Sequence, residues 1–332
     1  MKVTVLTESE LRKCVSLNHE VVEAIGEAFT WLAEGKAYMP PIMHIPVPEN
    51  NGDFDFKSAH TRGLESLAVK LGAGFFDNRK IGLPNATAMV VLLNAKTGFA
   101  RAVLLDNGYL TDVRTGAAGA VAAKHLSREN IENVGVIGAG AQGRYQMLGL
   151  RQVRSFKRLM VYDLDETQVQ RYIQEMSAQL DVEIVPAMDV RTVFESSDIV
   201  VTTTPAKIPY VKAEWLRPGL HITCMGADLP EKQELEPDVL TKVDVLVCDR
   251  KSQCFKMGEL HHGLVAGVIS EESEIIELGE VTSGRVMGRQ NNDQITICDL
   301  TGTGVQDTAI SLLAYKKATE MHLGIQVDNT IG

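Results

Sequence analysis

Residues 133–146 read NVGVIGAGAQGRYQ, and they give the clearest indication of how the second half of the chain folds. Its apolar start is typical of a buried strand, and it runs directly into Gly138, Gly140 and Gly143, which are spaced as GxGxxG. In that pattern the first glycine allows a tight turn, the second lets the backbone approach a pyrophosphate, and the third lets a helix pack closely on a strand. The amino end of the following helix presents oriented N–H groups to phosphates. The stretch therefore predicts a dinucleotide-binding site.

An acidic residue lies directly after the next apolar segment, residues 159–162. It is Asp163, twenty residues after Gly143. A carboxylate at this place accepts a hydrogen bond from the ribose 2′-hydroxyl of NAD and repels the 2′-phosphate of NADP. We therefore expect NAD(H) as the cofactor. The alternative is that Asp163 only caps the turn at residues 163–166.

Further apolar segments alternate with helical stretches along the second half of the chain. They lie at residues 134–137, 159–162, 199–203, 221–225 and 243–248. This alternation predicts an α/β fold with a doubly wound parallel sheet of the Rossmann type. Ligands of such sheets bind at the carboxyl ends of the strands. The expected cofactor contacts in this region are Gly138, Gly140, Ala141, Gln142, Gly143, Asp163, Thr203, Thr204, Met225 and Gly226.

The first third of the chain has a different pattern. Alternating or apolar runs separated by turn residues predict an antiparallel sheet with strands at residues 54–59, 67–71, 87–93 and 102–105. Before them we expect a strand over 2–6, a capping box from Thr7 to Glu10 and a helix over 19–34. Two more helices are expected at 111–125 and 307–323, the second returning to the first domain. The predicted division is an α+β domain, 1–118 with 308–332, and a Rossmann domain, 119–307.

The composition is that of a folded protein of about two domains. The chain has 332 residues, of which 45% are hydrophobic, and a formal net charge of −10. Such a charge disfavours nucleic acid or an anionic membrane as the principal partner. No apolar run reaches the roughly 20 residues that cross a bilayer, and residues 1–13 do not resemble a secretory signal, so we expect a soluble, cytoplasmic protein. The five scattered cysteines predict reduced, buried thiols.

Three segments together resemble the ornithine cyclodeaminase/mu-crystallin family. They are LLDNGYLTDVRTGAAGAVAAKHL at 104–126, VGVIGAGAQG at 134–143 and PGLHITCMGADLPEKQEL at 218–235. The resemblance is closer still to the ectoine-utilisation cyclodeaminases, through GFFDN at 74–78 and DLTGTGVQDTAI at 299–310. It implies a nicotinamide-dependent hydride transfer at an α-carbon that bears nitrogen, as in cyclodeaminases, ketimine reductases and amino-acid dehydrogenases. It also implies that the α+β domain binds the substrate and forms a homodimer through its sheet.

The resemblance places substrate-binding residues in the first domain. Arg114, at the start of an alanine-rich helix, matches the family's substrate-carboxylate arginine, although a salt bridge between the domains would also explain it. The next residue, Thr115, is similar to one that touches the cofactor phosphates. Lys70 stands alone among apolar residues and matches the family's substrate lysine, which could hold a carboxylate, polarise an imine or transfer a proton. The alternative for Lys70 is a solvent-facing sheet residue.

Three further positions bear on the reaction and the substrate. Asp228 matches the general base of the cyclodeaminases, but an Asp before Leu-Pro is also a common turn former. Lys57 falls where ornithine cyclodeaminases carry a glutamate that recognises a diamine, so it favours a distal carboxylate unless it lies on a solvated face. Asn85 takes the place of a small hydroxyl residue. The family's upstream carboxylate arginine is absent, with only His44 in that neighbourhood.

The other candidate residues can also be explained by purely structural roles. The adjacent His261 and His262 point in different directions on a helix and cannot easily share a metal, so we expect no metal site. Asp299 and Asp307 flank a glycine loop that could lie near the nicotinamide, but turn and capping roles explain them equally well.

The leading hypothesis is an NAD(H)-dependent imine reductase or amino-acid dehydrogenase that acts on a small, acidic α-imino acid. Iminosuccinate, reduced to aspartate, is the simplest case. The alternative is a cyclodeaminase of ornithine or diaminobutyrate, as in ectoine utilisation, which releases ammonia without net redox change. A third possibility, a non-enzymatic nicotinamide-binding protein, is disfavoured because Lys70, Arg114 and Asp228 are all retained.

Overall fold

The computed structural model, which describes residues 2–329, divides the chain into two units. The first unit contains the chain up to Ser16, Glu27–Arg114 and the chain from Thr303 onward; the second contains Leu17–Gly26 and Thr115–Gly302. The two units thus meet in the sequence at residues 114 and 303, whereas the predicted domain boundaries were residues 118 and 308. Residues 17–26 also differ from the expected division, because they belong to the second unit. In the part of the chain described, no helix combines the length and apolar character needed to cross a membrane.

The first unit is built on a mixed sheet. Its strands are β1 (Lys2–Thr7), β2 (Ala37–Tyr38), β3 (Met43–Val47), β4 (Gly52–Thr61), β5 (Ser66–Phe75), β6 (Ala86–Asn94), β7 (Ala100–Leu105) and β16 (Ile325–Asp328). The order is β16-β1-β7-β6-β5-β4-β2, and β3 pairs with β4. The predicted antiparallel pairing of β4, β5, β6 and β7 is confirmed. The sequence did not indicate β2, β3 and β16, which are short or lie at an edge.

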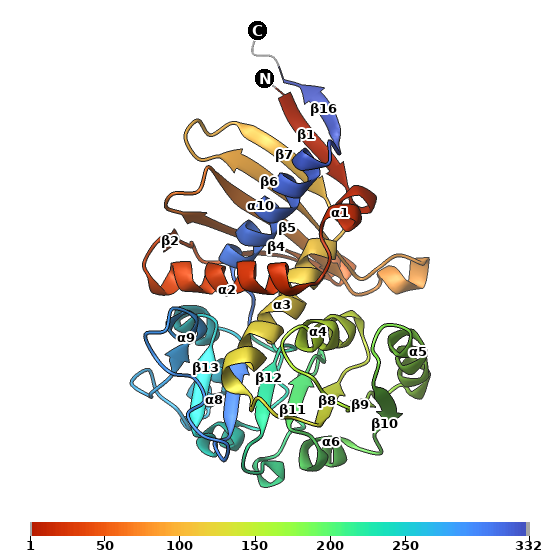
Figure 1. Ribbon diagram of the computed structural model, residues 1–332, viewed down its shortest axis with the longest axis vertical. Coiled ribbons are helices and arrows are strands. Elements are labelled where there is room, and N and C mark those ends of the chain that lie inside the picture. Colours follow the sequence, from red (N-terminus) through yellow and green to blue (C-terminus); the bar gives the residue numbers. More distant parts are fainter. Residues whose placement is uncertain (1, 330–332) are drawn as a thin grey trace. The chain divides into compact units, whose positions relative to one another are not determined.

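Small residues let a helix lie close to one face of this sheet. Helix α10 (Gly304–Glu320) packs on β4 and β5, as Figure 1 shows. On that face the strands present buried alanines, among them Ala59 and Ala68, and a Cβ on Gly304 would collide with the backbone of Ser58. The hydroxyl of Thr308 donates to the carbonyl of Ala59 at 3.0 Å. The expected return of the last helix to the first domain is therefore observed.

Three more helices begin in or continue into the first unit. They are α1 (Glu8–Cys14), α2 (His19–Ala33) and α3 (Tyr109–Leu126), with short 3₁₀ turns η1 (Pro48–Asn50) and η2 (Asn78–Ile81). The predicted capping box opens α1, because the backbone N–H of Thr7 donates to Glu10 Oε2 at 2.9 Å. The division between the two units falls inside α2 and inside α3.

The second unit is a parallel sheet of eight strands. They are β8 (Asn133–Ile137), β9 (Arg158–Tyr162), β10 (Glu183–Pro186), β11 (Ile199–Thr202), β12 (His221–Cys224), β13 (Val245–Cys248), β14 (Ile276–Glu277) and β15 (Thr296–Asp299). The order β10-β9-β8-β11-β12-β15-β13-β14 confirms the predicted doubly wound sheet. The sequence did not indicate β10, β14 or β15, and β15 lies between β12 and β13.

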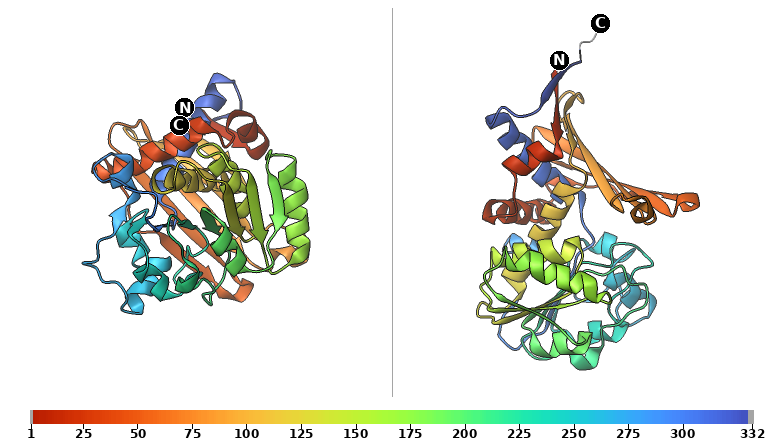
Figure 2. Two further views of the ribbon diagram at one scale, coloured as in Figure 1. Left: turned by 60° about the horizontal axis from the view of Figure 1, so that its bottom comes forward. Right: turned by 90° about the vertical axis from the view of Figure 1, so that its right-hand side faces the viewer.

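Helices cover both faces of this second sheet (Figure 2). They are α4 (Ala141–Arg151), α5 (Glu166–Ser177), α6 (Val190–Ser196), α7 (Lys251–Cys254), α8 (Glu259–Val265) and α9 (Leu278–Thr282), with turns η3 (Ala213–Trp215) and η4 (Pro237–Thr241). Alternate residues of one strand enter different cores: Val136 packs with Met147 of α4 on one face, whereas Ile137 packs with Phe194 of α6 on the other. Burial on both faces explains why these strands are continuously apolar.

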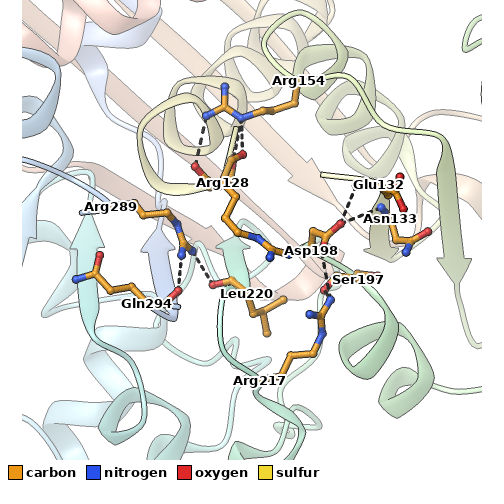
Figure 3. Close-up of polar contacts among 11 residues, drawn as sticks. Arg128, Glu132, Asn133, Arg154, Ser197, Asp198, Arg217, Leu220, Arg289 and Gln294 are labelled. Atoms are coloured by element: carbon orange, nitrogen blue, oxygen red, sulfur yellow. Dashed lines mark hydrogen bonds and ion pairs between the residues drawn. The ribbon is translucent and has the colours of Figure 1, made fainter. Parts of the chain in front are cut away.

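The amino edge of the same sheet is closed by charged groups (Figure 3). Asp198, just before β11, accepts hydrogen bonds from the backbone N–H groups of residues 132 and 133 at 2.8 and 3.0 Å and from Arg128. Arg154 and Arg289 donate to backbone carbonyls at the carboxyl end of α3, at 2.7 and 2.6 Å. Cations at a helix carboxyl end interact favourably with its dipole. These contacts are structural, and the ligand sites of such a sheet lie at the opposite edge, where the strands have their carboxyl ends.

Candidate functional site

Each of the three glycines in the β8–α4 turn has the surroundings that its predicted role requires. Gly138 has a φ of 101°, a value that other residues rarely adopt. A Cβ on Gly140 would meet no other atom within 4 Å, which leaves open space where a pyrophosphate would approach. A Cβ on Gly143, in contrast, would collide with the carbonyl oxygen of Gly138, so close packing of helix and strand depends on this glycine. The turn therefore fits a dinucleotide.

The helix that follows the turn offers its amino end to phosphate. Gly140 is the N-cap of α4, which begins with Ala141 and Gln142 and has eleven residues. The hydroxyl of Thr203, after β11, donates to the carbonyls of Ile137 and Gly138 at 3.0 and 3.1 Å and so holds the turn in place. The predicted contacts on β8, α4 and β11 are thus close together in the structure.

Asp163 lies at the end of β9, where a ribose-binding acid is expected. Its Oδ2 accepts the N–H of Ala139 at 2.8 Å, and its Oδ1 accepts the N–H of Asp165 at 3.0 Å. Each carboxylate oxygen has a second lone pair available for a ribose hydroxyl. The residue therefore combines the turn-capping role considered above with a position suited to recognition of NAD.

The charge of Asp163 should set the choice between NADH and NADPH. Substitution D163N is expected to lower the ratio of kcat/KM for NADH over NADPH by about tenfold, because about 1.4 kcal/mol of charge repulsion against a 2′-phosphate is lost. Steady-state kinetics with both cofactors measures the ratio. The control D165N changes a neighbouring acid that only caps α5, through Thr167 N at 2.9 Å. An unchanged ratio in D163N would remove Asp163 from cofactor recognition.

Three charged side chains meet inside the first unit. Lys70 Nζ on β5 lies 3.3 Å from Asp307 Oδ1, and Arg114 Nε on α3 lies 3.1 Å from the same oxygen. Lys70 is 5%, Arg114 5% and Asp307 1% exposed. The other oxygen, Asp307 Oδ2, is buried and has no hydrogen-bond partner among the residues described. Lys70 and Arg114, both predicted as substrate residues, are therefore brought together by an acid whose role the sequence left open.

The protonation states of this cluster follow from burial and from its charges. Burial lowers the pKa of the Lys70 ammonium to about 8; Asp307 opposes this shift, and the positive charges of Arg114 and Lys57 add to it. For Asp307, burial alone would raise the pKa, but Lys70, Arg114 and Lys57 outweigh it and hold the pKa below its usual value. Near neutral pH the cluster therefore contains an ionised Asp307 and a protonated Lys70 that can give up its proton readily.

Lys57 lies directly opposite Lys70, on the neighbouring strand β4. Directly opposite residues of an antiparallel pair point to the same face of the sheet, so Lys57 faces the side that carries the Lys70 cluster. It is half-buried there and acts electrostatically on both Lys70 and Asp307. His44, in the neighbourhood of the missing family arginine, instead pairs with Asp55 at 2.9 Å. The alternative of a fully solvated Lys57 does not fit this position.

Two predicted residues lie outside the cluster of Lys70, Arg114 and Asp307. Asn85 precedes β6, and its Oδ1 accepts the N–H of Arg79 at 3.3 Å. Its carbonyl accepts the N–H of Phe75, five residues beyond Lys70 along β5, so the structure does not bring Asn85 next to Lys70. Thr115 is buried, and its carbonyl accepts Gln146 Nε2 at 2.9 Å; it belongs to the second unit.

Asp228 lies on the loop after β12, within the second unit. Its side chain is 49% exposed and pairs with Lys232 at 2.7 Å. An exposed carboxylate on a loop at the carboxyl end of a Rossmann strand can exchange protons with a ligand. Met225 and Gly226 precede it on the same loop, and the N–H of Gly226 donates to Glu234 Oε2 at 3.0 Å. Asp228 therefore keeps both possible roles, general base and loop former.

The remaining candidates have structural partners. His261 Nδ1 lies 3.1 Å from the carbonyl of Phe255, and His262 Nε2 lies 2.8 Å from the carbonyl of Lys232. Asp299 is buried and accepts the N–H of Leu260 at 3.0 Å, and burial raises its pKa to about 8. The five cysteines are buried thiols in the structure. Within residues 2–329 no group of three or more His, Cys, Asp or Glu side chains could hold a metal ion.

No definite functional role was assigned from the sequence to two buried acids, Asp307 and Glu234. For Asp307 a place near the nicotinamide and a turn or capping role were equally good explanations, and it does stand in the first turn of α10, next to the capping box of Thr303 and Gln306. Its distance of 193 residues from Arg114 hid their pairing. Glu234, within PEKQEL, looks like part of a polar loop, yet it is 0% exposed. No signal in one sequence reveals that burial.

Comparison with known proteins gives consistent relatives. The chain matches the ornithine cyclodeaminase/mu-crystallin family over residues 1–322. It is 45% identical to a putative dehydrogenase of Rhizobium meliloti, with 97% of this chain and 98% of that protein covered. It is also 45% identical to an uncharacterised cyclodeaminase of Sinorhizobium fredii, with 96% and 97% covered.

Solved structures with the same fold contain the expected cofactor. An archaeal alanine dehydrogenase dimer with bound NAD has a TM-score of 0.92 and 33% identity, covering 99% of this chain and 100% of that one. The iminosuccinate reductase of Paracoccus denitrificans in complex with NAD+ has a TM-score of 0.91 and 28% identity, covering 99% and 100%. The Rossmann fold and NAD as cofactor, both predicted from the glycine turn and Asp163, are confirmed.

Proposed function

Because the chain belongs to the ornithine cyclodeaminase/mu-crystallin family of NAD-dependent imine reductases, dehydrogenases and cyclodeaminases, we propose that it reduces a small α-imino dicarboxylic acid to the amino acid. Iminosuccinate, reduced to aspartate, is the simplest such substrate. One observation carries this proposal: Lys57 lies opposite Lys70 on the sheet face where Lys70 and Arg114 meet.

The charge of the cluster supports a substrate with two carboxylates. Lys57, Lys70 and Arg114 all act on the carboxylate of Asp307, and Lys70 acts also on the buried carboxyl of Asp106, so these three cations outnumber the two acids. Asp55, on the same strand as Lys57, pairs with His44 at 2.9 Å. A dianion would be attracted to this face, whereas the second ammonium of a diamine would be repelled.

The side chains have distinct roles in the proposed reaction. A nicotinamide cofactor, when bound, would supply the hydride for the imine carbon. Arg114, which presents a planar fork of N–H donors, holds the α-carboxylate, and Lys57 attracts the distal carboxylate. The imine nitrogen must also gain a proton, for which Lys70, with its pKa lowered to about 8, is suited. Asp228, an exposed acid on the β12 loop, is a second group able to handle that proton.

Cyclodeamination is the second candidate. Here the substrate would first lose a hydride from its α-carbon to NAD+ and a proton from its α-amino group, which gives an imine. The second amino group would attack the imine carbon and displace ammonia, and the hydride would return to the cyclic imine so formed, with no net redox change. Asp228 favours it as the general base that removes a proton from the substrate nitrogen. The similarity to the Sinorhizobium fredii cyclodeaminase also supports it. Lys57 disfavours it, because a diamine would bring an ammonium toward this lysine.

Two assays distinguish these candidates. In the first, the protein is incubated with NADH, oxaloacetate and ammonia, which form iminosuccinate in solution, and absorbance reports NADH oxidation. In the second, NAD+ is mixed with ornithine or diaminobutyrate, and released ammonia is measured. Net NADH loss in the first assay alone supports the reductase. Ammonia release without NADH accumulation in the second would replace it with the cyclodeaminase.

Lys57 should determine the preference between acidic and uncharged imines. The substitution K57E is expected to raise KM for iminosuccinate by about tenfold or more, since attraction of about 1 kcal/mol becomes repulsion. The imine of pyruvate, which lacks the second carboxylate, should be affected far less. The ratio of kcat/KM for the two imines measures the effect. An unchanged ratio would mean that Lys57 does not contact the substrate.

The sheet of the first unit also supports the proposed homodimer. On the face opposite the Lys70 cluster, half-buried apolar side chains alternate with the buried ones, including Val69 and Leu71 on β5 and Met89 and Val91 on β6. A second copy of the chain would cover this apolar surface. Light scattering should give twice the monomer mass, and the double substitution V69K/V91K should halve it. A monomeric wild-type protein would exclude the dimer.

A further inference from the structure

One buried carboxylate joins the two loops of the second unit that are expected to border the nicotinamide. Glu234, 0% exposed, follows the loop after β12 and precedes η4. Its Oε1 accepts the N–H and the hydroxyl of Thr204, at 2.7 and 2.6 Å, from the loop after β11. Its Oε2 accepts the N–H of Gly226, at 3.0 Å, from the loop after β12. The carboxylate thus binds one loop with each oxygen.

The Glu234 carboxylate is in close contact with groups on several sides. A Cβ on Gly226 would collide with the Glu234 carboxylate and with the carbonyl of Thr204, so the loop after β12 can approach only because residue 226 is glycine. The phenol of Tyr210 donates a further hydrogen bond to Glu234 Oε1 at 2.7 Å. A buried carboxylate is stable only when such donors replace its water shell.

A second carboxylate fixes the backbone of the first. Glu259 on α8, also buried, accepts the N–H of Glu234 at 2.8 Å and the N–H of Leu235 at 3.1 Å. In addition, the N–H groups of Tyr210 and Val211 donate to the carbonyl of Glu234 at 2.9 and 3.0 Å. The side chain of Glu234 therefore extends from a rigid backbone, which makes it a reference point for both loops.

We propose that Glu234 is a positioning residue, which sets the spacing of the Thr203–Thr204 and Met225–Asp228 loops and thereby places the nicotinamide end of NAD(H) and Asp228 for hydride and proton transfer. This inference rests on the proposed assignment of those loops to the cofactor. The loop from Gly226 to Glu234 is closed by the Glu234 carboxylate itself, and Asp228 lies two residues from the point of closure. Movement of the carboxylate would therefore move Asp228.

The test compares two isosteric substitutions of buried carboxylates at opposite edges of one sheet. In E234Q one oxygen becomes an NH₂ group that faces N–H donors, so one loop loses its acceptor. In the matched control, D198N, the altered side chain likewise binds two backbone N–H groups, but at the amino edge (Figure 3). Fluorescence titration with NADH, in the absence of any substrate, gives Kd. This readout does not depend on the identity of the imino acid.

Both variants should melt at lower temperature, but only E234Q should lose function. We expect its Kd for NADH to rise about tenfold and its kcat to fall about 10²-fold, as a displacement near 1 Å can cause. The primary isotope effect with 4-deuterated NADH should increase, because hydride transfer becomes slower relative to other steps. KM for the imino acid should change less than kcat. E234D, which keeps the carboxyl group but is one methylene shorter, should not restore activity.

Three outcomes would overturn the proposal. They are a folded E234Q protein whose Kd and kcat stay within twofold of the wild type, a D198N protein whose Kd rises as much as that of E234Q, and full activity in E234D. If E234Q does not fold, Y210F replaces it, because this change removes one donor to Glu234 and leaves the others. A roughly threefold loss of NADH affinity in Y210F supports the proposal, and unchanged kinetics contradict it.

Discussion

The substitution K70M is expected to lower kcat/KM for imine reduction by about 10³-fold, within the 10²–10⁴-fold range of general acid–base catalysis. Lys70 is a buried residue of β5, and its ammonium lies 3.3 Å from Asp307 Oδ1. It is proposed to protonate the imine nitrogen or to hold a carboxylate. Methionine fills the same space without charge or proton. Steady-state kinetics with NADH and iminosuccinate measure the loss, and the Kd of NADH should stay unchanged.

The pH profile tests the same assignment. Because the protonated form of Lys70 is required, activity should be constant below its pKa of about 8 and fall as pH rises through that value. This alkaline decline should be missing from the residual activity of K70M. The control K80M changes a lysine that is 75% exposed and paired with Asp77, and it should leave the profile intact. A K70M protein with wild-type kinetics, or with the same alkaline decline, would exclude Lys70.

Loss of stability would not explain an inactive K70M protein. The pKa of Lys70 lies below 10.5 in the folded state, so its charged form is less favourable there than in the unfolded chain. The cost is fully present below pH 8 and disappears as pH rises from about 8 to 10.5. Removing the charge should therefore leave the midpoint of urea unfolding at neutral pH unchanged or higher.

The features that the sequence predicts well are local ones. The roles of Gly138, Gly140 and Gly143 depend on neighbours within a single turn, and the structure shows each role as expected. The period of apolar residues likewise identified most strands, because burial on one or both faces is recorded within each strand. β15, with the sequence TICD, was not recognised. Its insertion between β12 and β13 depends on contacts far apart in the chain.

From the sequence we could predict only those site residues whose chemical type, at that place in the chain, suggests a function. Lys70 attracted attention because a charge among apolar residues needs an explanation, and Arg114 because it matched a family motif. Their common partner, Asp307, was noted only as an acid beside a glycine loop, and its contact with Lys70 and Arg114 was not predicted, since an acid in the first turn of a helix is ordinary. Glu234 was not recognised because a glutamate in a polar loop is usually exposed. Which acid is buried depends on the fold and cannot be read from the residue alone.

The substitution D307N is expected to lower the free energy of unfolding by about 3–5 kcal/mol, the cost of breaking a buried ion pair by removing one partner. Asp307 is 1% exposed and is the carboxylate to which both Lys70 and Arg114 bind through Oδ1. Without its charge, two buried cations would lie close together and would lose the carboxylate that binds both. Urea unfolding at pH 7 measures the loss. The control D77N removes an exposed carboxylate paired with Lys80 and should produce no measurable change.

Two further measurements on D307N connect its stability with the proposed substrate. Asp307 raises the pKa of Lys70, so its loss should move the alkaline decline of activity to a pH below 8. A dicarboxylate that binds at Lys70 and Arg114 would supply the missing negative charge. L-Aspartate should therefore raise the melting temperature of D307N more than that of the wild type. If D307N is as stable as the wild type and its alkaline decline is unchanged, the three side chains do not act as one charged cluster.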